Sequence, residues 1–230
     1  MERNISLEEI SDGRLYGSND LVKADSGDCE GCCACCRGMG SSIILDPYDI
    51  YRLGSGLDMQ FGQLLAERLE LNMADGIILP NLKMAGEGDA CSFLDTRGRC
   101  SIHIYRPGFC RLFPLGRIYG NRSFQYFLQI HECQKENRTK VKVRKWIDTP
   151  DFRTYEKFVA DWHFFLKDLG DGMKDGGSQE CMKAVNMYVL NRFYVAPYRT
   201  DEDFYPQFYE RLEEAAAFAA GWNIKIKADE

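Results

Sequence analysis

The chain has 230 residues, 45% of them hydrophobic, and carries a formal net charge of −6 at pH 7. That length and apolar content suit one sizeable domain, or a small metal-binding module with a helical partner, and they exclude a mainly disordered chain. The negative charge argues against a general nucleic-acid binder.

The cysteine content narrows the class of protein further. No run reaches the roughly 18 apolar residues that cross a bilayer, and the start, MERNISLEEI, lacks the apolar core of a signal peptide. We therefore expect a cytoplasmic protein with no membrane contact. Because cytoplasmic thiols stay reduced, the ten cysteines predict metal ligands or catalytic groups rather than disulfides.

The first 25 residues are polar, and we expect them to form a peripheral segment. Ser6 and Glu9 have the spacing of a capping box for a short helix. The segment leads into DCEGCCACCRG, which holds five cysteines in eight residues: Cys29, Cys32, Cys33, Cys35 and Cys36. Small adjacent side chains bury little apolar area, so this cluster predicts a cage of thiolates and not a piece of core.

Two ligand spacings can be taken from this cluster. Cys29, Cys33 and Cys36 give C-x3-C-x2-C, the spacing with which radical SAM enzymes hold a cluster with one open iron. Five cysteines in eight positions satisfy several such patterns by chance, and no alternating strands and helices of a barrel follow Cys36. We therefore favour C-x2-C-x2-C-C, formed by Cys29, Cys32, Cys35 and Cys36.

Regular elements separate this cluster from a second one. Residues 43–45 predict a short strand, Asp46 a helix N-cap and Pro47 the first helical residue. The spacing of apolar residues predicts a core-facing helix over 58–73. The apolar stretch IILPNLKMA that follows is expected to be extended.

The second cysteine group is spread over residues 91–133. Cys91, Cys100 and Cys110 are separated by turn signals, Arg-Gly and Pro-Gly, and such loops can bring distant thiols to one point. Cys133 follows a predicted hairpin. The chain therefore offers two sets of four cysteines.

The order of these motifs resembles a known family. The chain reads C-x2-C-x2-C-C-R-G, then D-P-Y-D-I-Y-R-L, then C-x-F-L, G-R-C-S-I and R-P-x-x-C-R-L-F-P between about residues 29 and 135. This combination is similar to the YkgJ-type cysteine-cluster proteins, which are described as a zinc- or iron-chelating domain and have the flagellin N-methylase as a distant relative. By position, the resemblance implies eight metal ligands: Cys29, Cys32, Cys35, Cys36, Cys91, Cys100, Cys110 and Cys133.

Some features of the chain depart from that family. Cys33 stands where a small residue is expected, which leaves open whether it replaces a neighbour as ligand. The chain after about residue 150 shows no methylase signature. Cys181 lies at helical spacing from Val185 and Tyr188, which predicts a buried structural cysteine.

Sets of four thiolates hold either zinc or an iron–sulfur cluster. A structural zinc usually takes two ligands from each of two C-x2-C knuckles, which leaves one thiol too many in the adjacent pair Cys35 and Cys36. Ferredoxin-type sequences also repeat the C-x2-C step. We therefore predict one or two [4Fe-4S] clusters, with zinc as the alternative.

A few polar side chains lie close to the cysteines in sequence. His103 and His131 could enter a metal shell, although such histidines are more often surface or hydrogen-bonded groups. Arg106 and Arg111 flank Cys110, and we expect them either to offset the negative charge of a cluster or to be ordinary surface arginines near a turn.

Apolar periodicity predicts a helical C-terminal region. A hairpin with its turn at 120–121 and a charged edge strand over 138–145 precede it. Helices are then expected from Thr149 through Leu166, over 178–194 and over TDEDFYPQFYERLEEAAAFAAG, with GDGMKDGG as a loop.

The sequence thus predicts a mainly α protein with short β pieces (α+β). We expect a peripheral segment over 1–25, a cysteine-rich metal-binding domain over 26–148 and a helical cap over 149–230. The leading function is an iron–sulfur protein in redox or electron transfer, with an unknown redox or protein partner and an undetermined oligomeric state. The alternatives are a structural zinc module for protein interaction and a cluster-dependent protein-modifying enzyme of the flagellin methylase type, so enzymatic activity is left open.

Overall fold

The chain forms two compact units, and each is built from two separate stretches. The first comprises Met1–Ile43 and Leu82–Tyr155, and the second comprises Ile44–Asn81 and Glu156–Glu230. The computed structural model describes residues 6–27, 32–86 and 88–227. The division expected from the sequence, into segments 1–25, 26–148 and 149–230, remains a prediction.

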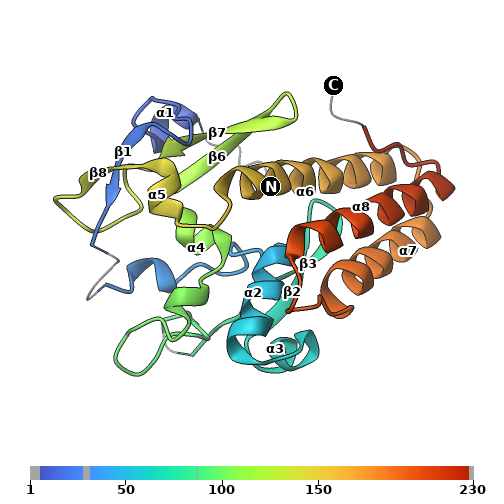
Figure 1. Ribbon diagram of the computed structural model, residues 1–230, viewed down its shortest axis with the longest axis horizontal. Helices are drawn as coiled ribbons and strands as arrows, with labels where there is room; N and C mark the ends of the chain where they lie inside the picture. Colours follow the sequence, from blue (N-terminus) through green and yellow to red (C-terminus); the bar gives the residue numbers. More distant parts are fainter. Residues whose placement is uncertain (1–5, 28–31, 87, 228–230) are drawn as a thin grey trace. The chain divides into compact units, whose positions relative to one another are not determined.

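Short helices and strands make up the first unit (Figure 1). They are α1 (Leu7–Ile10), β1 (Leu21–Asp25), β4 (Met84–Ala85), β5 (Ala90–Cys91), α4 (Gly108–Leu112), β6 (Leu115–Gly120), β7 (Ser123–Leu128), β8 (Thr139–Lys142) and α5 (Val143–Ile147), with 3₁₀ turns η1 (Ala34–Cys36) and η2 (His103–Tyr105). The strands pair antiparallel as β1 with β8, β4 with β5 and β6 with β7.

The hairpin of β6 and β7 confirms a turn expected from the sequence. Its ladder runs from the pair Leu115 and Leu128 to the pair Gly120 and Ser123. The two turn residues, at 121–122, have φ of 50° and 52°. Positive φ at both central residues is typical of the type I′ turn, whose twist matches that of the strands. The turn therefore lies one residue later than predicted.

The N-terminal segment pairs with strands of the first unit. Tyr16 and Tyr126 exchange two backbone hydrogen bonds of 2.8 and 2.9 Å, and Val22 of β1 is 1% exposed. The predicted short helix is present as α1, and Ser6 is its N-cap. The Ser6 hydroxyl accepts a hydrogen bond from the N–H of Glu8 at 3.3 Å.

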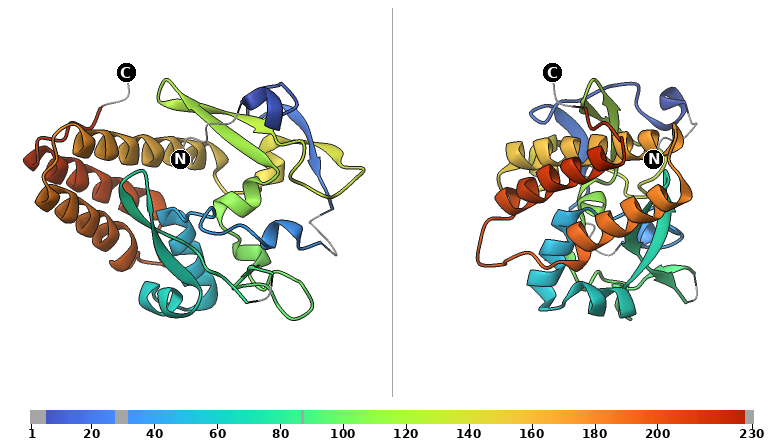
Figure 2. Two further views of the ribbon diagram at one scale, coloured as in Figure 1. Left: turned by 180° about the vertical axis from the view of Figure 1, so that it is seen from behind. Right: turned by 90° about the vertical axis from the view of Figure 1, so that its right-hand side faces the viewer.

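The second unit consists mainly of helices (Figure 2). It contains α2 (Pro47–Leu57), α3 (Phe61–Glu67), β2 (Leu69–Ala74), most of β3 (Ile77–Leu82), most of α6 (Phe152–Lys174), α7 (Gln179–Leu190), a π-helical turn η3 (Asn191–Val195) and α8 (Phe204–Gly221). Helices α6, α7 and α8 lie side by side in both views. In the described part of the chain, no helix is both long and apolar enough to cross a membrane.

Aromatic side chains fill the core of the second unit. The rings of Phe158 on α6 and Phe208 on α8 meet edge-on with centroids 4.6 Å apart, and Trp162 contacts Phe193 at 4.7 Å. Phe158, Phe193 and Phe208 are fully buried. Such rings bury about 150–250 Å² each, so the aromatic faces expected on these helices form the core.

Polar caps mark the helix starts that the sequence predicts. The carboxylate of Asp46 accepts the N–H of Asp49 at 2.8 Å, and Pro47 is the first residue of α2. Ser178 accepts the N–H of Cys181 at 3.1 Å at the start of α7. With helices and four two-stranded sheets among the described residues, the α+β class is confirmed.

The helix predicted over 58–73 is wrong in its second half. Helix α3 ends at Glu67, and β2 then pairs with β3. Between these strands Asp75 and Gly76 have φ of 52° and 89°. An Asp-Gly pair at positive φ is a strong hairpin signal, and here it outweighs the helical spacing of the apolar residues before it.

The loop predicted as GDGMKDGG is also shorter than expected, because α6 continues to Lys174. Two glycines in this last part of α6 make close contacts. A Cβ on Gly170 would lie 2.9 Å from the carbonyl oxygen of Asp75, and one on Gly172 would lie 2.6 Å from Ile224. Tertiary packing therefore favours helix at positions whose intrinsic helix propensity is poor.

The charged strand predicted over 138–145 ends early. Strand β8 stops at Lys142, and α5 begins at Val143. Val143 and Ile147 are both fully buried. Their i, i+4 spacing places both side chains on one helical face, so burial of that face accounts for the change from strand to helix.

Candidate metal centre

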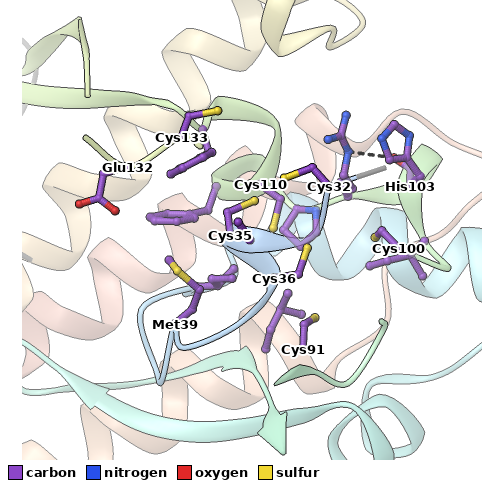
Figure 3. Close-up of a pocket in the computed structure, with 18 of the residues that line it drawn as sticks. Cys32, Cys35, Cys36, Met39, Cys91, Cys100, His103, Cys110, Glu132 and Cys133 are labelled. Carbon is purple, nitrogen blue, oxygen red and sulfur yellow. Dashed lines mark hydrogen bonds between the residues drawn. The ribbon is translucent and has the colours of Figure 1, made fainter. Parts of the chain in front are cut away.

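Seven of the described cysteines line one cavity of about 100 Å³ in the first unit (Figure 3). They are Cys32, Cys35, Cys36, Cys91, Cys100, Cys110 and Cys133. Cys35 and Cys110 lie near the middle of the view, with Cys133 at the upper left, Cys100 at the right and Cys91 below. A single water needs about 10–15 Å³ on this measure, so the cavity has room for a group of several atoms.

Backbone pairing holds the first cysteine group beside β5. Arg37, which directly follows Cys36, forms an antiparallel bridge with Ala90. The N–H of Gly38 donates to the carbonyl of Asp89 at 2.9 Å. Since β5 is Ala90–Cys91, this bridge brings thiols that are far apart in sequence to the same cavity.

Cys100 follows a tight loop built around Asp95. The carboxylate of Asp95 accepts the backbone N–H of Arg97 at 2.9 Å and that of Arg99 at 2.8 Å. These bonds, the one from Arg99 first, hold the pKa of Asp95 below its usual value. Gly98 has φ of 72°, a conformation that glycine adopts readily. The turn predicted here is confirmed.

Cys110 lies on α4, whose position is fixed by two side chains. The indole N–H of Trp146 donates to the carbonyl of Phe113 at 3.1 Å. Arg111, which is 5% exposed, donates from Nη1 to the hydroxyl of Thr149. A ligand-bearing helix that is held in this way presents its thiol in a defined direction.

The two arginines that flank Cys110 occupy different environments. Arg106 lines the cavity, and its Nε donates to the carbonyl of His103 at 3.2 Å (Figure 3). Arg111 does not line the cavity, and its guanidinium carbon lies 5.4 Å from the centre of the Tyr155 ring. Arg106 therefore brings positive charge to the thiols, whereas Arg111 is neither a surface group nor a cavity group.

The adjacent pair Cys35 and Cys36 lies on the turn η1, and both thiols line the cavity. The neighbouring thiol of Cys36 and burial raise the pKa of the Cys35 thiol well above its usual value, while the charge of Arg106 acts in the opposite direction. Because a metal binds thiolates, binding at this pair would displace protons.

A comparison with protein families identifies this constellation. Residues 28–144 match the CxxCxxCC family, described as "putative zinc- or iron-chelating domain". The chain belongs to this family. The match covers just over half of the chain and agrees with the resemblance drawn from the sequence motifs. A search of the curated proteins and a search of the solved structures each gave no match.

Most of the predicted ligands of the CxxCxxCC domain come together at the cavity. Seven of the eight line it, and the eighth, Cys29, lies outside the described residues. Cys33 does not line the cavity and lies beside Gly98, with its sulfur 3.7 Å from where a Cβ would be. Cys181 is buried in α7 of the second unit, as predicted. The eight-ligand assignment stays a prediction.

Other polar groups of the cavity were only partly expected. His103 lines it, whereas His131 is exposed and does not. Glu132 and Lys135 also line the cavity, although no sequence motif indicated them. The sequence feature that could have indicated them is their position within two residues of Cys133, because residues next to a cavity-lining residue often line the same cavity.

The donor chemistry of the cavity fits a thiolate-bound metal. Seven thiols line it together with one imidazole and one carboxylate, and soft sulfur ligands select zinc, Cu(I) and iron–sulfur clusters. Among the residues that the structure describes, no three Cys, His, Asp or Glu side chains lie close enough to hold a metal ion. The thiols therefore face one cavity without meeting at one point, and the domain is a metal-chelating domain on its family and donor set.

Proposed function

We propose that the CxxCxxCC domain holds a [4Fe-4S] cluster through its cavity thiols and uses it to transfer electrons. The number of thiols carries this proposal, since seven described cysteines line one cavity. A structural zinc takes four ligands, whereas four thiolates serve each [4Fe-4S] cluster. Seven thiols, with Cys29 as a predicted eighth, suit one or two clusters better than a single zinc ion.

The surroundings of the thiols are consistent with electron transfer. When bound, such a cluster supplies a centre that accepts or gives one electron. The guanidinium of Arg106 offsets part of the negative charge of the thiolates. Cys91 is buried, and the other six cavity cysteines are half-buried. The cavity is therefore shielded from bulk water but still within reach of a partner at the surface.

Metal and acid-labile sulfide analysis of protein prepared without oxygen, together with a visible spectrum, tests this proposal. We expect a brown protein with about four iron and four sulfide per cluster. Cys110→Ser should lower the iron content, and Cys181→Ser should leave it unchanged because Cys181 lies in the second unit. Zinc without sulfide in the wild-type protein would contradict the iron–sulfur assignment.

A structural zinc site is the second candidate, and the thiol pair favours it. Cys35 and Cys36 are adjacent on η1 and both line the cavity, so they could supply two ligands to a single ion. Such a site would be colourless and would hold zinc in stoichiometric amount, and chelation of the zinc should destabilise the first unit, because structural zinc contributes to folding free energy.

A further inference from the structure

Charge is distributed unevenly along the chain. The whole chain has a net charge of −6, yet residues 82–155 contain 14 Lys and Arg against 7 Asp and Glu. This stretch belongs to the first unit and carries the second cysteine group. A local excess of positive charge in an acidic protein favours encounters with an anionic partner in that region.

Positive charge is also in excess at the cavity itself. Arg99, Arg106 and Lys135 line it, and Glu132 is the one carboxylate among its described lining residues. Arg99 is exposed, and the described part of the chain provides no ion-pair partner for its guanidinium. Arg106 acts on the Cys35 thiol, and Arg99 and Lys135 add two further positive charges to the same lining.

An exposed apolar side chain lies next to these charges. Ile104 is 76% exposed and sits on the turn η2, between His103 and Arg106, which both line the cavity. An apolar contact surrounded by charged groups is the usual anatomy of a protein–protein interface. Ile104 therefore favours a protein partner over a small anion.

From these observations we infer that the basic lining of the cavity, Arg99, Arg106 and Lys135, together with the neighbouring exposed Ile104, docks an acidic electron-carrier protein; these four residues are called the mouth. The inference rests on the proposed function, because the carrier exchanges electrons with the group that the thiols hold. In one encounter the carrier loses one electron and a cluster gains it, and no bond is made or broken. Complementary charge speeds such encounters by about 10- to 1000-fold at low salt.

Binding of poly-L-glutamate to protein of known iron content provides the test, with calorimetry at low and high salt as the readout. The mouth variant is Arg99→Glu with Lys135→Glu. Its matched control is Lys140→Glu with Lys142→Glu, which makes the same charge change at exposed positions of β8 in the same unit. We expect the mouth variant to weaken binding about tenfold and the control about twofold or less.

A second readout reports on the metal centre directly. Protein adsorbed on a carboxylate-coated electrode should exchange electrons faster than on an amine-coated one, because the carboxylate surface orients the mouth towards the electrode. The mouth variant should lose this preference, and the control should keep it. If Arg99→Glu disturbs the neighbouring Cys100, Ile104→Ser with Lys135→Glu replaces that variant with the same expected loss.

Several outcomes would overturn the inference. They are equal loss of binding in the two variants, binding that does not weaken with salt, and binding of poly-uridylate in preference to poly-glutamate, which would identify a nucleic-acid partner. Iron and a redox signal without any dependence on surface charge would remove the docking surface alone. Zinc without iron would remove the proposed function and the electron exchange with it.

Discussion

Arg111 donates a hydrogen bond from Nη1 to the hydroxyl of Thr149, and both residues are buried in the first unit. Arg111 follows Cys110 on α4, so the bond ties a helix that carries a cavity thiol to the segment before α6. The other guanidinium nitrogens, Nε and Nη2, have no hydrogen-bond partner among the described residues. Thr149 is thus the acceptor that the described chain provides for this buried cation.

Thr149→Val should therefore destabilise the protein. Valine keeps the shape of threonine but leaves another buried guanidinium N–H unpaired, which costs about 1–3 kcal/mol in free energy of unfolding. Urea denaturation checks this value. Thr149→Ser keeps the hydroxyl and should stay much closer to wild type, so equal losses in the two variants would show that the methyl group and not the hydrogen bond matters.

Asn186 connects α7 to the β2–β3 hairpin of the second unit. Its Oδ1 accepts the N–H of Ile78 at 2.6 Å, and its Nδ2 donates to the carbonyl of Gly76 at 3.1 Å. Asn186→Ala leaves the N–H of Ile78 and the carbonyl of Gly76 without this partner. We expect the free energy of unfolding, measured by thermal unfolding, to fall by about 2 kcal/mol or more. Asn191→Ala is the control, because Asn191 is exposed and should tolerate the change.

The two cysteine substitutions Cys33→Ser and Cys36→Ser should have different effects on metal content. Cys36 lines the cavity and Cys33 does not. Removal of a residue that hydrogen-bonds to a metal ligand lowers metal affinity by about 10- to 100-fold. Removal of a ligand thiol itself, at Cys36, should therefore lower metal affinity by more than about tenfold. Elemental analysis after dialysis measures the difference. Metal loss from Cys33→Ser as large as that from Cys36→Ser would place Cys33 among the ligands.

Tyr16 makes the stability of the first unit sensitive to alkaline pH. Burial, together with a hydrogen bond from its hydroxyl to the carboxylate of Asp12, raises the pKa of Tyr16 from 10.0 to about 12. Because the folded-state pKa is the higher one, the stabilisation is fully present below pH 10 and is lost as the pH rises through about 12.

The difference in unfolding free energy between wild type and Tyr16→Phe measures this effect. It should be about 1 kcal/mol near neutral pH, the usual size of one hydrogen bond. The difference should shrink as the pH rises above 10. Using the difference removes the contribution of lysines that titrate in the same range, and a difference that is constant with pH would contradict the assignment.

Local signals in the sequence predicted many of the elements correctly. Asp46 and Pro47 mark the start of α2 because a capping carboxylate and a fixed proline φ act within one turn of helix. The Asp75–Gly76 turn is also a local signal, but the helix predicted over 58–73 rested on apolar spacing and took no account of it. Periodicity was misleading there because short apolar segments fit both helix and strand.

The sequence by itself determined that this protein offers thiolates in two groups, with the motifs of its family, since these depend only on residue types and spacing. The tertiary structure alone decided that Cys91 and Cys110 face the same cavity as Cys36, and that Arg106 lines it while Arg111 is buried beside Tyr155. These outcomes depend on pairing and packing between segments far apart in sequence. The local sequence of a short helix or loop does not determine which of its faces the rest of the unit will bury.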